Sequence, residues 1–248
     1  MKHRLIQFYS LLLVQLPLCM ATDDKAVELV QRVEDLYRST ASQATMTMRV
    51  KTPYYERSMT MESYTIGRDK MLIRILTPRK ERGIATLKLD KEMWNFFPKI
   101  NKTIKIPPSM MMGSWMGSDF TNDDLVKETS LTKHYSLNLK EELKIYEIIL
   151  TPREQTVTVW DKIVVKINKK NLTPIEQAFF DKKGRKIRVM TYREPKQFGD
   201  VILPSIIEIL PLNKKGRKTI VVYDKIELNA QDVEDDLFTL RSLKRRLR

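Results

Sequence analysis

Apolar and polar residues alternate with a period of two along most of this 248-residue chain. In residues 44–50, alanine, methionine and valine alternate with threonine and arginine, as expected of a strand with one buried face. Five further segments of this kind follow before residue 107, separated by short turns such as residues 67–69. Six strands joined by short turns predict an antiparallel meander, and its apolar face needs a cover.

The second half of the chain repeats this organisation. We expect strands at residues 144–150, 156–160, 163–167, 175–180, 187–192, 205–210 and 219–228. No linker rich in proline or serine interrupts the chain, so we expect residues 22–248 to form a single domain. The predicted class is α+β, mostly β, with an open antiparallel sheet of about eleven strands.

Residues 1–21 have the features of a secretory signal. Basic residues at positions 2–4 precede an apolar run that is shorter than the roughly 20 residues needed to span a bilayer. Cys19 and Ala21 are small residues at the two positions that a signal peptidase reads, so we predict cleavage after Ala21. Two alternatives stay open: a lipoprotein signal acylated at Cys19, although Leu18 stands where a small residue is expected, and an uncleaved anchor.

Cleavage after Ala21 would change the chemistry of the chain. It would remove the only cysteine, so the mature protein would have neither a disulfide nor a thiol. The loss of Lys2 and Arg4 would lower the formal net charge from +14 to +12. His134 would be the only histidine of an exported, basic protein of about 227 residues.

Two helices are expected in addition to the strands. Residues 22–38 predict an amphipathic helix, which Thr22 or Asp23 can cap. Residues 121–127 predict a short helix in which Thr121 and Asp124 have the spacing of a capping box. Aspartates at positions 119, 123 and 124 gather at the start of this helix, and capping is a better interpretation of them than a metal site.

The stretch of residues 91–126 concentrates tryptophan, methionine and phenylalanine. Residues 107–118 carry no charge, whereas most loops of this chain carry lysine and arginine. Such a loop either plugs a core or lines a site for an apolar ligand, and methionine suits both roles because its side chain repacks easily. We predict a lid over a hydrophobic cavity. The candidate lining residues, of which about half should face inward because strand residues alternate, are Met93, Trp94, Phe96, Phe97, Met110, Met111, Met112, Trp115, Met116 and Phe120.

The sequence gives little support for catalysis. No cysteine nucleophile would survive cleavage, and His134 lies in a polar stretch without a nucleophile-elbow pattern. No glycine-rich phosphate-binding loop occurs among the seven glycines. We therefore expect no enzyme, no metal and no cofactor.

The basic balance of the chain has several interpretations. Lysine-rich hairpin tips are typical of a solvated surface and discourage edge-to-edge pairing of strands. The tail of residues 241–248 has five basic residues, and contact with an anionic membrane surface or a partner is as plausible as disorder. Nucleic acid would fit the charge, but export and the lack of a stripe of aromatic residues and arginines argue against it.

Three segments carry a family resemblance: WNFFPKINKTIKI (residues 94–106), GSDFTNDDL (117–125) and DDLFTLRSL (235–243). They resemble the bacterial outer-membrane lipoprotein-sorting protein family, which is related to the periplasmic lipoprotein carrier LolA. The resemblance covers essentially the whole mature chain. It implies an open, LolA/LolB-like half-barrel with helices on its concave side, periplasmic handling of acyl chains, and frequent association with membrane exporters. Residues 110–112 are methionines where the family more usually has polar or basic residues, which makes the lid more apolar.

From the residues and the resemblance together, we predict a periplasmic carrier or chaperone. It would bind the acyl chains of a lipoprotein or lipid in its hydrophobic cavity, for sorting toward the outer membrane. An inner-membrane exporter or an outer-membrane acceptor would be its protein partner, and nucleic acid would not be a partner. The alternative is a periplasmic sensor or adaptor of a membrane exporter that uses the same fold and carries nothing.

Overall fold

The computed structural model describes residues 24–127 and 131–245. Its main feature is one antiparallel sheet of 13 strands, in the order β6-β5-β4-β3-β2-β1-β13-β12-β11-β10-β9-β8-β7. The expected mostly-β class with an open antiparallel sheet is confirmed, with 13 strands in place of about eleven. The strands are β1 (Ala41–Lys51), β2 (Glu56–Ile66), β3 (Lys70–Thr77), β4 (Ala85–Leu89), β5 (Glu92–Phe97), β6 (Lys102–Lys105), β7 (Tyr135–Glu141), β8 (Ile145–Pro152), β9 (Lys162–Asn168), β10 (Pro174–Phe180), β11 (Lys186–Phe198), β12 (Val201–Pro211) and β13 (Lys218–Leu228).

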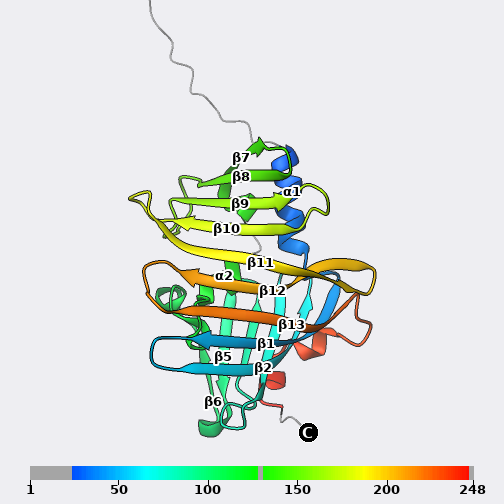
Figure 1. Ribbon diagram of the computed structural model, residues 1–248. Coiled ribbons are helices and arrows are strands. Elements are labelled where there is room, and N and C mark those ends of the chain that lie inside the picture. Colours follow the sequence, from blue (N-terminus) through cyan, green and yellow to red (C-terminus); the bar gives the residue numbers. More distant parts are fainter. Residues whose placement is uncertain (1–23, 128–130, 246–248) are drawn as a thin grey trace, which may run out of the picture.

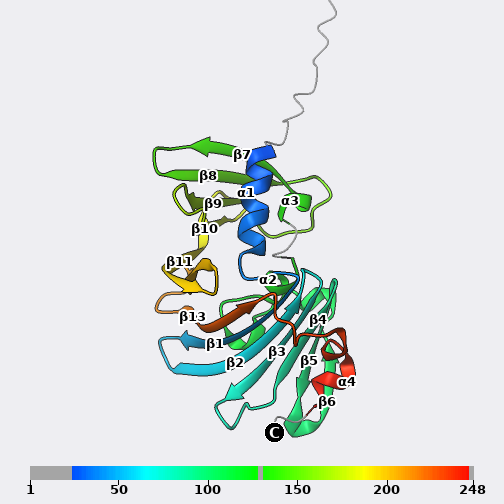
Figure 2. The ribbon, with the colours of Figure 1, turned by 90° about the vertical axis from the view of Figure 1, so that its right-hand side faces the viewer.

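The helices of the described chain are short. They are α1 (Asp24–Asp35), α2 (Asn122–Lys127), α3 (Leu131–His134) and α4 (Leu240–Leu243), with 3₁₀ turns η1 (Pro98–Ile100), η2 (Pro108–Met110), η3 (Trp115–Gly117) and η4 (Asp235–Leu237). The sheet forms a tall ladder of strands from β7 to β6 (Figure 1). Seen from the side, the sheet curves, with α1, α3 and α2 on its concave face (Figure 2), and α4 packs against β4.

The topology explains why the concave face is covered. Strands β6 and β7 follow one another in sequence, yet they are the two opposite edges of the sheet. The connection between them must therefore cross the molecule, and it contains η2, η3, α2 and α3. This connection includes the uncharged loop that the sequence marks as a lid.

Helix α1 buries one apolar face. Ala26, Leu29, Val30 and Val33 follow the spacing of a helical stripe and pack into the main hydrophobic cluster with the concave face of the sheet. The helix ends at Asp35, three residues before the predicted boundary. Its predicted caps, at positions 22 and 23, lie outside the described residues.

Alternation along the strands builds the rest of the core. Strands β1 and β2 bury every second residue on the concave side, and Met46 pairs with Met61 while Met48 pairs with Met59 across the two strands. Strand β3 is buried on both faces, as its apolar sequence predicts. Its outer face contributes Leu72 to a second cluster, which also contains Leu87, Phe96, Val233, Phe238 and Leu243.

Two strand assignments were wrong. Residues 156–160, although they alternate, form no strand, because β8 pairs directly with β9 and leaves no edge for them; Val157 and Val159 are exposed. Residues 135–141, for which we predicted no strand, form the edge strand β7, and its Tyr135 and Leu137 are buried in the main cluster.

The predicted signal peptide and the last three residues of the basic tail lie outside the described residues. None of the helices within residues 24–127 and 131–245 is both long enough and apolar enough to cross a membrane.

Candidate functional site

A cavity of about 130 Å³ lies between the concave face of the sheet and the segments that cover it. The sheet supplies its floor from strands as far apart as β3 and β10, and α1, η3, α2 and α3 supply its roof. The apolar and aromatic lining residues are Val33, Tyr37, Ala44, Met46, Met61, Met71, Ile73, Trp115, Phe120, Leu125, Leu131, Met190, Tyr192, Ile207, Val221 and Tyr223. Four of the floor residues are methionines, whose flexible thioethers adapt to the shape of what they contact.

Trp115 is the main apolar anchor of the lid. Its side chain is buried, and its indole Nε1 donates a hydrogen bond of 3.0 Å to Thr86 Oγ1 on β4. Met116 and Gly117 follow with φ values of 49° and 70°, so the chain makes a tight left-handed turn directly after the tryptophan. The carbonyl oxygen of Met116 accepts a hydrogen bond from Arg57 Nη2 on β2, which fixes this turn to the sheet.

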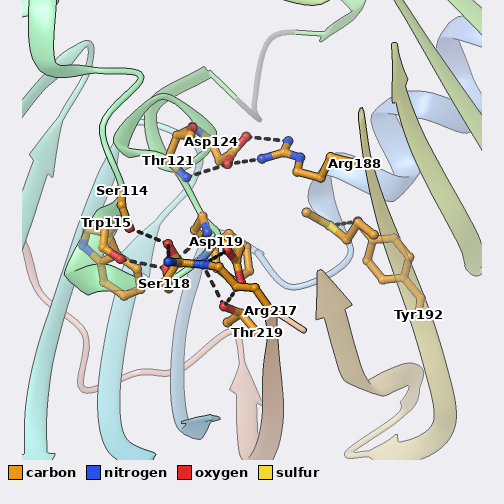
Figure 3. A network of polar contacts seen from close by, with 12 residues as sticks. Ser114, Trp115, Ser118, Asp119, Thr121, Asp124, Arg188, Tyr192, Arg217 and Thr219 are labelled. Atoms are coloured by element: carbon orange, nitrogen blue, oxygen red, sulfur yellow. Dashed lines mark hydrogen bonds and ion pairs between the residues drawn. The ribbon is translucent and has the colours of Figure 1, made fainter. Parts of the chain in front are cut away.

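Asp119 forms the second anchor of the lid (Figure 3). Its side chain is only 2% exposed and pairs with Arg217 Nε, which lies just before β13. Thr219 Oγ1 donates to Asp119 Oδ2 at 2.8 Å and accepts from the Asp119 backbone N–H at 2.9 Å. Arg217 also donates to the carbonyl oxygen of Gly117 at 2.9 Å. Asp119 therefore anchors the lid to the sheet and does not cap helix α2.

Asp124 performs the capping role that its spacing predicts and one more. Its Oδ2 accepts from the Thr121 N–H at 2.8 Å, and Thr121 Oγ1 accepts from the Asp124 N–H at 3.1 Å, which completes a capping box. Its two oxygens also receive Arg188 of β11, at 2.6 and 2.9 Å (Figure 3). The Arg188 guanidinium lies over the rings of Phe179 and Trp160. Among the described residues, no three His, Cys, Asp or Glu side chains lie close enough to hold a metal.

Polar groups line one side of the cavity near the end of α1. Glu34 is buried; its Oε1 accepts from the Leu131 N–H at 2.7 Å, and its Oε2 lies 3.0 Å from Arg68 Nη1. Arg68 also pairs with Asp35, and that hydrogen bond is the main reason why the pKa of Arg68 is raised. Tyr37 stacks on Tyr223 with a centroid distance of 4.8 Å. The cavity is thus mainly apolar, with charged groups at this side and polar side chains such as Ser63 and Gln177 among the strand residues that line it.

The predicted lining residues lie in three places. Trp115 and Phe120 line the cavity, and Met116 packs against the main cluster beside it. Met93 is fully buried, whereas Trp94 and Phe96 belong to the second cluster and Phe97 is half-buried. Met111 is half-buried, and Met110 and Met112 are exposed on the lid.

Most of the floor was absent from that prediction. Met46, Met61, Met71 and Met190 lie on strands whose alternation placed them in a core, and nothing local to them signals a cavity. The excess of methionine over the whole chain, 13 residues, is the one signal that could have found them.

Comparisons with known proteins agree with this architecture. A family model described as "-like: Uncharacterized protein" matches residues 67–245. No curated protein matches the chain.

Three similar solved structures show the same fold. The first is a domain described as an outer-membrane lipoprotein-sorting protein from Vibrio parahaemolyticus, at 22% identity, with 90% of this chain and 99% of that chain covered and a TM-score of 0.76. The second is a DUF1329 family protein from Desulfovibrio piger, at 19% identity, with 89% and 98% covered and a TM-score of 0.77. The third is a LolA superfamily protein from Nitrosomonas europaea, at 20% identity, with 90% and 99% covered and a TM-score of 0.70.

The family match spans more than half of the chain, and the structural matches span nearly all of it. The resemblance seen in the sequence is thereby confirmed. The chain belongs to the family that this model describes, and it has the fold of the LolA-like outer-membrane lipoprotein-sorting proteins.

Proposed function

We propose that the protein is a periplasmic carrier that binds acyl chains of a lipid or lipoprotein on the concave face of its sheet and hands them toward the outer membrane. The observation that carries this proposal is the cavity beneath Trp115 and Phe120, with its floor of methionines. Concave apolar sites with a few polar groups at the rim are the usual form of small-ligand sites. The driving force would be removal of acyl surface from water, at about 25 cal/mol per Å².

The size of the cavity defines what must move. At about 130 Å³ it is comparable to a cavity of about 150 Å³ that holds one benzene molecule. The closed form therefore accommodates only a few carbons of a chain. A full acyl chain requires Trp115 and Phe120 to leave the concave face, which means release of the contacts made by Arg57, Asp119 and Asp124.

The candidate residues take different roles in this proposal. Trp115 and Phe120 fill the position of the acyl chain in the closed form and become its cover in the open form. Met110, Met111 and Met112 lie on the lid without lining the cavity, and the exposed Met110 and Met112 meet the membrane surface when the lid opens. Trp94 and Phe96 contribute to the packing of the opposite face.

The test uses two methionines of the same strand. Met61 lines the cavity; Met59, two residues away on the same face and equally buried, does not. Met61→Trp should fill the cavity and abolish uptake of a fluorescent fatty acid. Met59→Trp should retain uptake. Urea unfolding of each variant measures the fraction of folded protein, to which uptake is normalised. Lipid extraction of the exported native protein, followed by mass spectrometry, should identify a bound lipid. Absence of any bound lipid together with no uptake by the wild type would refute the carrier.

A second candidate function is that of an adaptor for a membrane exporter. It is favoured by the exposure of Met110 and Met112 on the surface of the lid. Neighbouring apolar side chains that are exposed to solvent are typical of a surface that binds another protein or a membrane. Met110→Lys combined with Met112→Lys separates the two functions. A carrier with this double change keeps its uptake of fatty acid, whereas an adaptor loses its membrane partner and shows no uptake before or after the change.

A further inference from the structure

We propose that the cavity selects a single-chain amphiphile with an anionic head, and that Arg38 binds the carboxylate or phosphate of that head. This inference rests on the proposed function and deepens it, because it names the class of ligand. Arg38 lies just after the end of α1 and lines the cavity. It places a positive charge on the polar side of a mainly apolar cavity, which Glu34, Ser42, Ser63, Thr65 and Gln177 also line.

The guanidinium of Arg38 has an unused donor. Its Nη1 is buried and has no hydrogen-bond partner among the described residues. Two other arginines, Arg57 and Arg74, also have a buried atom without a partner, but in both the atom is Nε, and their Nη atoms are bound to protein groups. Arg38 is the member of this set whose terminal nitrogen remains open, and it is the one on the cavity wall.

The nearest acidic groups in sequence are already engaged. Glu34 gives one oxygen to the Leu131 N–H and the other to Arg68. Asp35 receives Arg68 through both of its oxygens, each at 2.7 Å. These pairings offset the negative charges of the two carboxylates. Neither carboxylate is therefore the partner of Arg38, and an incoming anion can pair with its guanidinium.

The surroundings of Arg38 suit a charged head joined to an apolar chain. Ser42 and Thr65 line the same cavity, and their hydroxyl groups form a hydrogen bond of 2.6 Å with one another. They make this part of the cavity wall polar. The methionine floor continues from this rim toward Trp115. A guanidinium binds carboxylate and phosphate oxygens with two parallel hydrogen bonds, which a neutral alcohol cannot reproduce.

The experiment is a calorimetric titration of the whole exported protein with four probes at one ionic strength: decanoate, decyl phosphate, 1-decanol and inorganic phosphate. Decanoate and decyl phosphate should bind at least about tenfold more tightly than 1-decanol, as expected for a hydrogen-bonded charge. Inorganic phosphate should bind far more weakly than decyl phosphate. Equal affinity for decyl phosphate and inorganic phosphate would indicate a site for a free anion, and it would overturn the proposal that the ligand is an amphiphile.

Variants assign the selectivity to Arg38. Arg38→Gln should remove the advantage of the two acids and leave the affinity for 1-decanol unchanged, which also shows that the variant is folded; Arg38→Lys should retain part of the advantage. Arg32→Gln, at an exposed position in the last turn of α1, is the matched control and should change nothing. Equal binding of acids and alcohol, or an Arg38→Gln variant that still prefers acids, overturns this inference alone. Failure of all three chain compounds to bind the wild type overturns the proposed function itself.

Discussion

Two ends of the concave face are built from different side chains. Strands β8 and β9 present Ile148, Leu150, Ile163, Val165 and Ile167, all fully or almost fully buried. Strands β1, β2 and β3 present Met46, Met48, Met59, Met61 and Met71 in the same cluster. The cavity touches three of these methionines and none of the aliphatic residues of β8 and β9.

The comparison teaches how one sheet can be both rigid and adaptable. β-Branched side chains have few rotamers, so the end at β8 and β9 packs in one defined way. Methionine has three rotatable bonds and fills irregular spaces at little cost. The end at β8 and β9 is thus built from side chains with few conformations, and the end that borders the cavity is built from flexible ones.

The largest effect should come from the aliphatic end. Ile167→Ala removes a fully buried side chain and should lower the free energy of unfolding by about 2–5 kcal/mol. Because Ile167 does not line the cavity, the affinity for decanoate should stay the same. Urea unfolding and calorimetry measure the two quantities, and a marked change in affinity would erase the distinction between the two ends.

The second largest effect should come from Asp119, which anchors the lid to the sheet. Asp119→Ala leaves Arg217 without its carboxylate, and because the Arg217 side chain is still 22% exposed, we expect a loss of about 2–3 kcal/mol, below the range for a fully buried pair. Amide hydrogen exchange across residues 107–121 should accelerate. Asp181→Asn, which alters an ion pair at an exposed hairpin, is the control. If the rate of amide hydrogen exchange in the lid were unchanged in the Asp119→Ala variant, Asp119 would not be an anchor of the lid.

A smaller effect is expected at the methionine end. Met61→Leu conserves volume and should cost less than about 1.5 kcal/mol of stability. Its branched side chain adapts less, so affinity should depend more strongly on the length of the fatty-acid chain than in the wild type. A titration series from octanoate to dodecanoate checks this, and an unchanged length dependence would show that flexibility of the floor has no part in binding.

The smallest effect should lie at the surface, where α1 meets β7. Hydrogen bonds from Lys25 and then Lys169 lower the pKa of Glu141. A lowered pKa stabilises the folded state above the ordinary carboxylate pKa of about 4.3, and this contribution disappears as the pH falls through the folded value. Glu141→Gln should therefore make stability slightly less dependent on pH in this acid range, as seen in urea midpoints recorded between neutral and acid pH. An identical pH profile would contradict the assignment.

Local patterns predicted the strands of the first half correctly because each one meets its sequence neighbour. Residues 44–50 alternate and pair with the next strand along the chain, so period and partner agree. Residues 156–160 alternate just as well and form no strand, because pairing depends on which edge is free. The candidate site divides in the same way: Trp115 and Phe120 were visible as unusual residues in an uncharged loop, whereas Arg188 and Arg217 gave no local sign of holding that loop.

The sequence by itself determined the mostly-β class, the amphipathic helix, the capping box at Thr121 and the uncharged lid, because each depends on residues close together in the chain. Only the tertiary structure decided that β6 and β7 lie at opposite edges, which sends the lid across the concave face. It also decided that methionines from several strands meet around one space and that Arg38, which has an open donor, lines that space. Contacts of this kind join residues far apart in sequence, and no local period or propensity encodes which of them will meet.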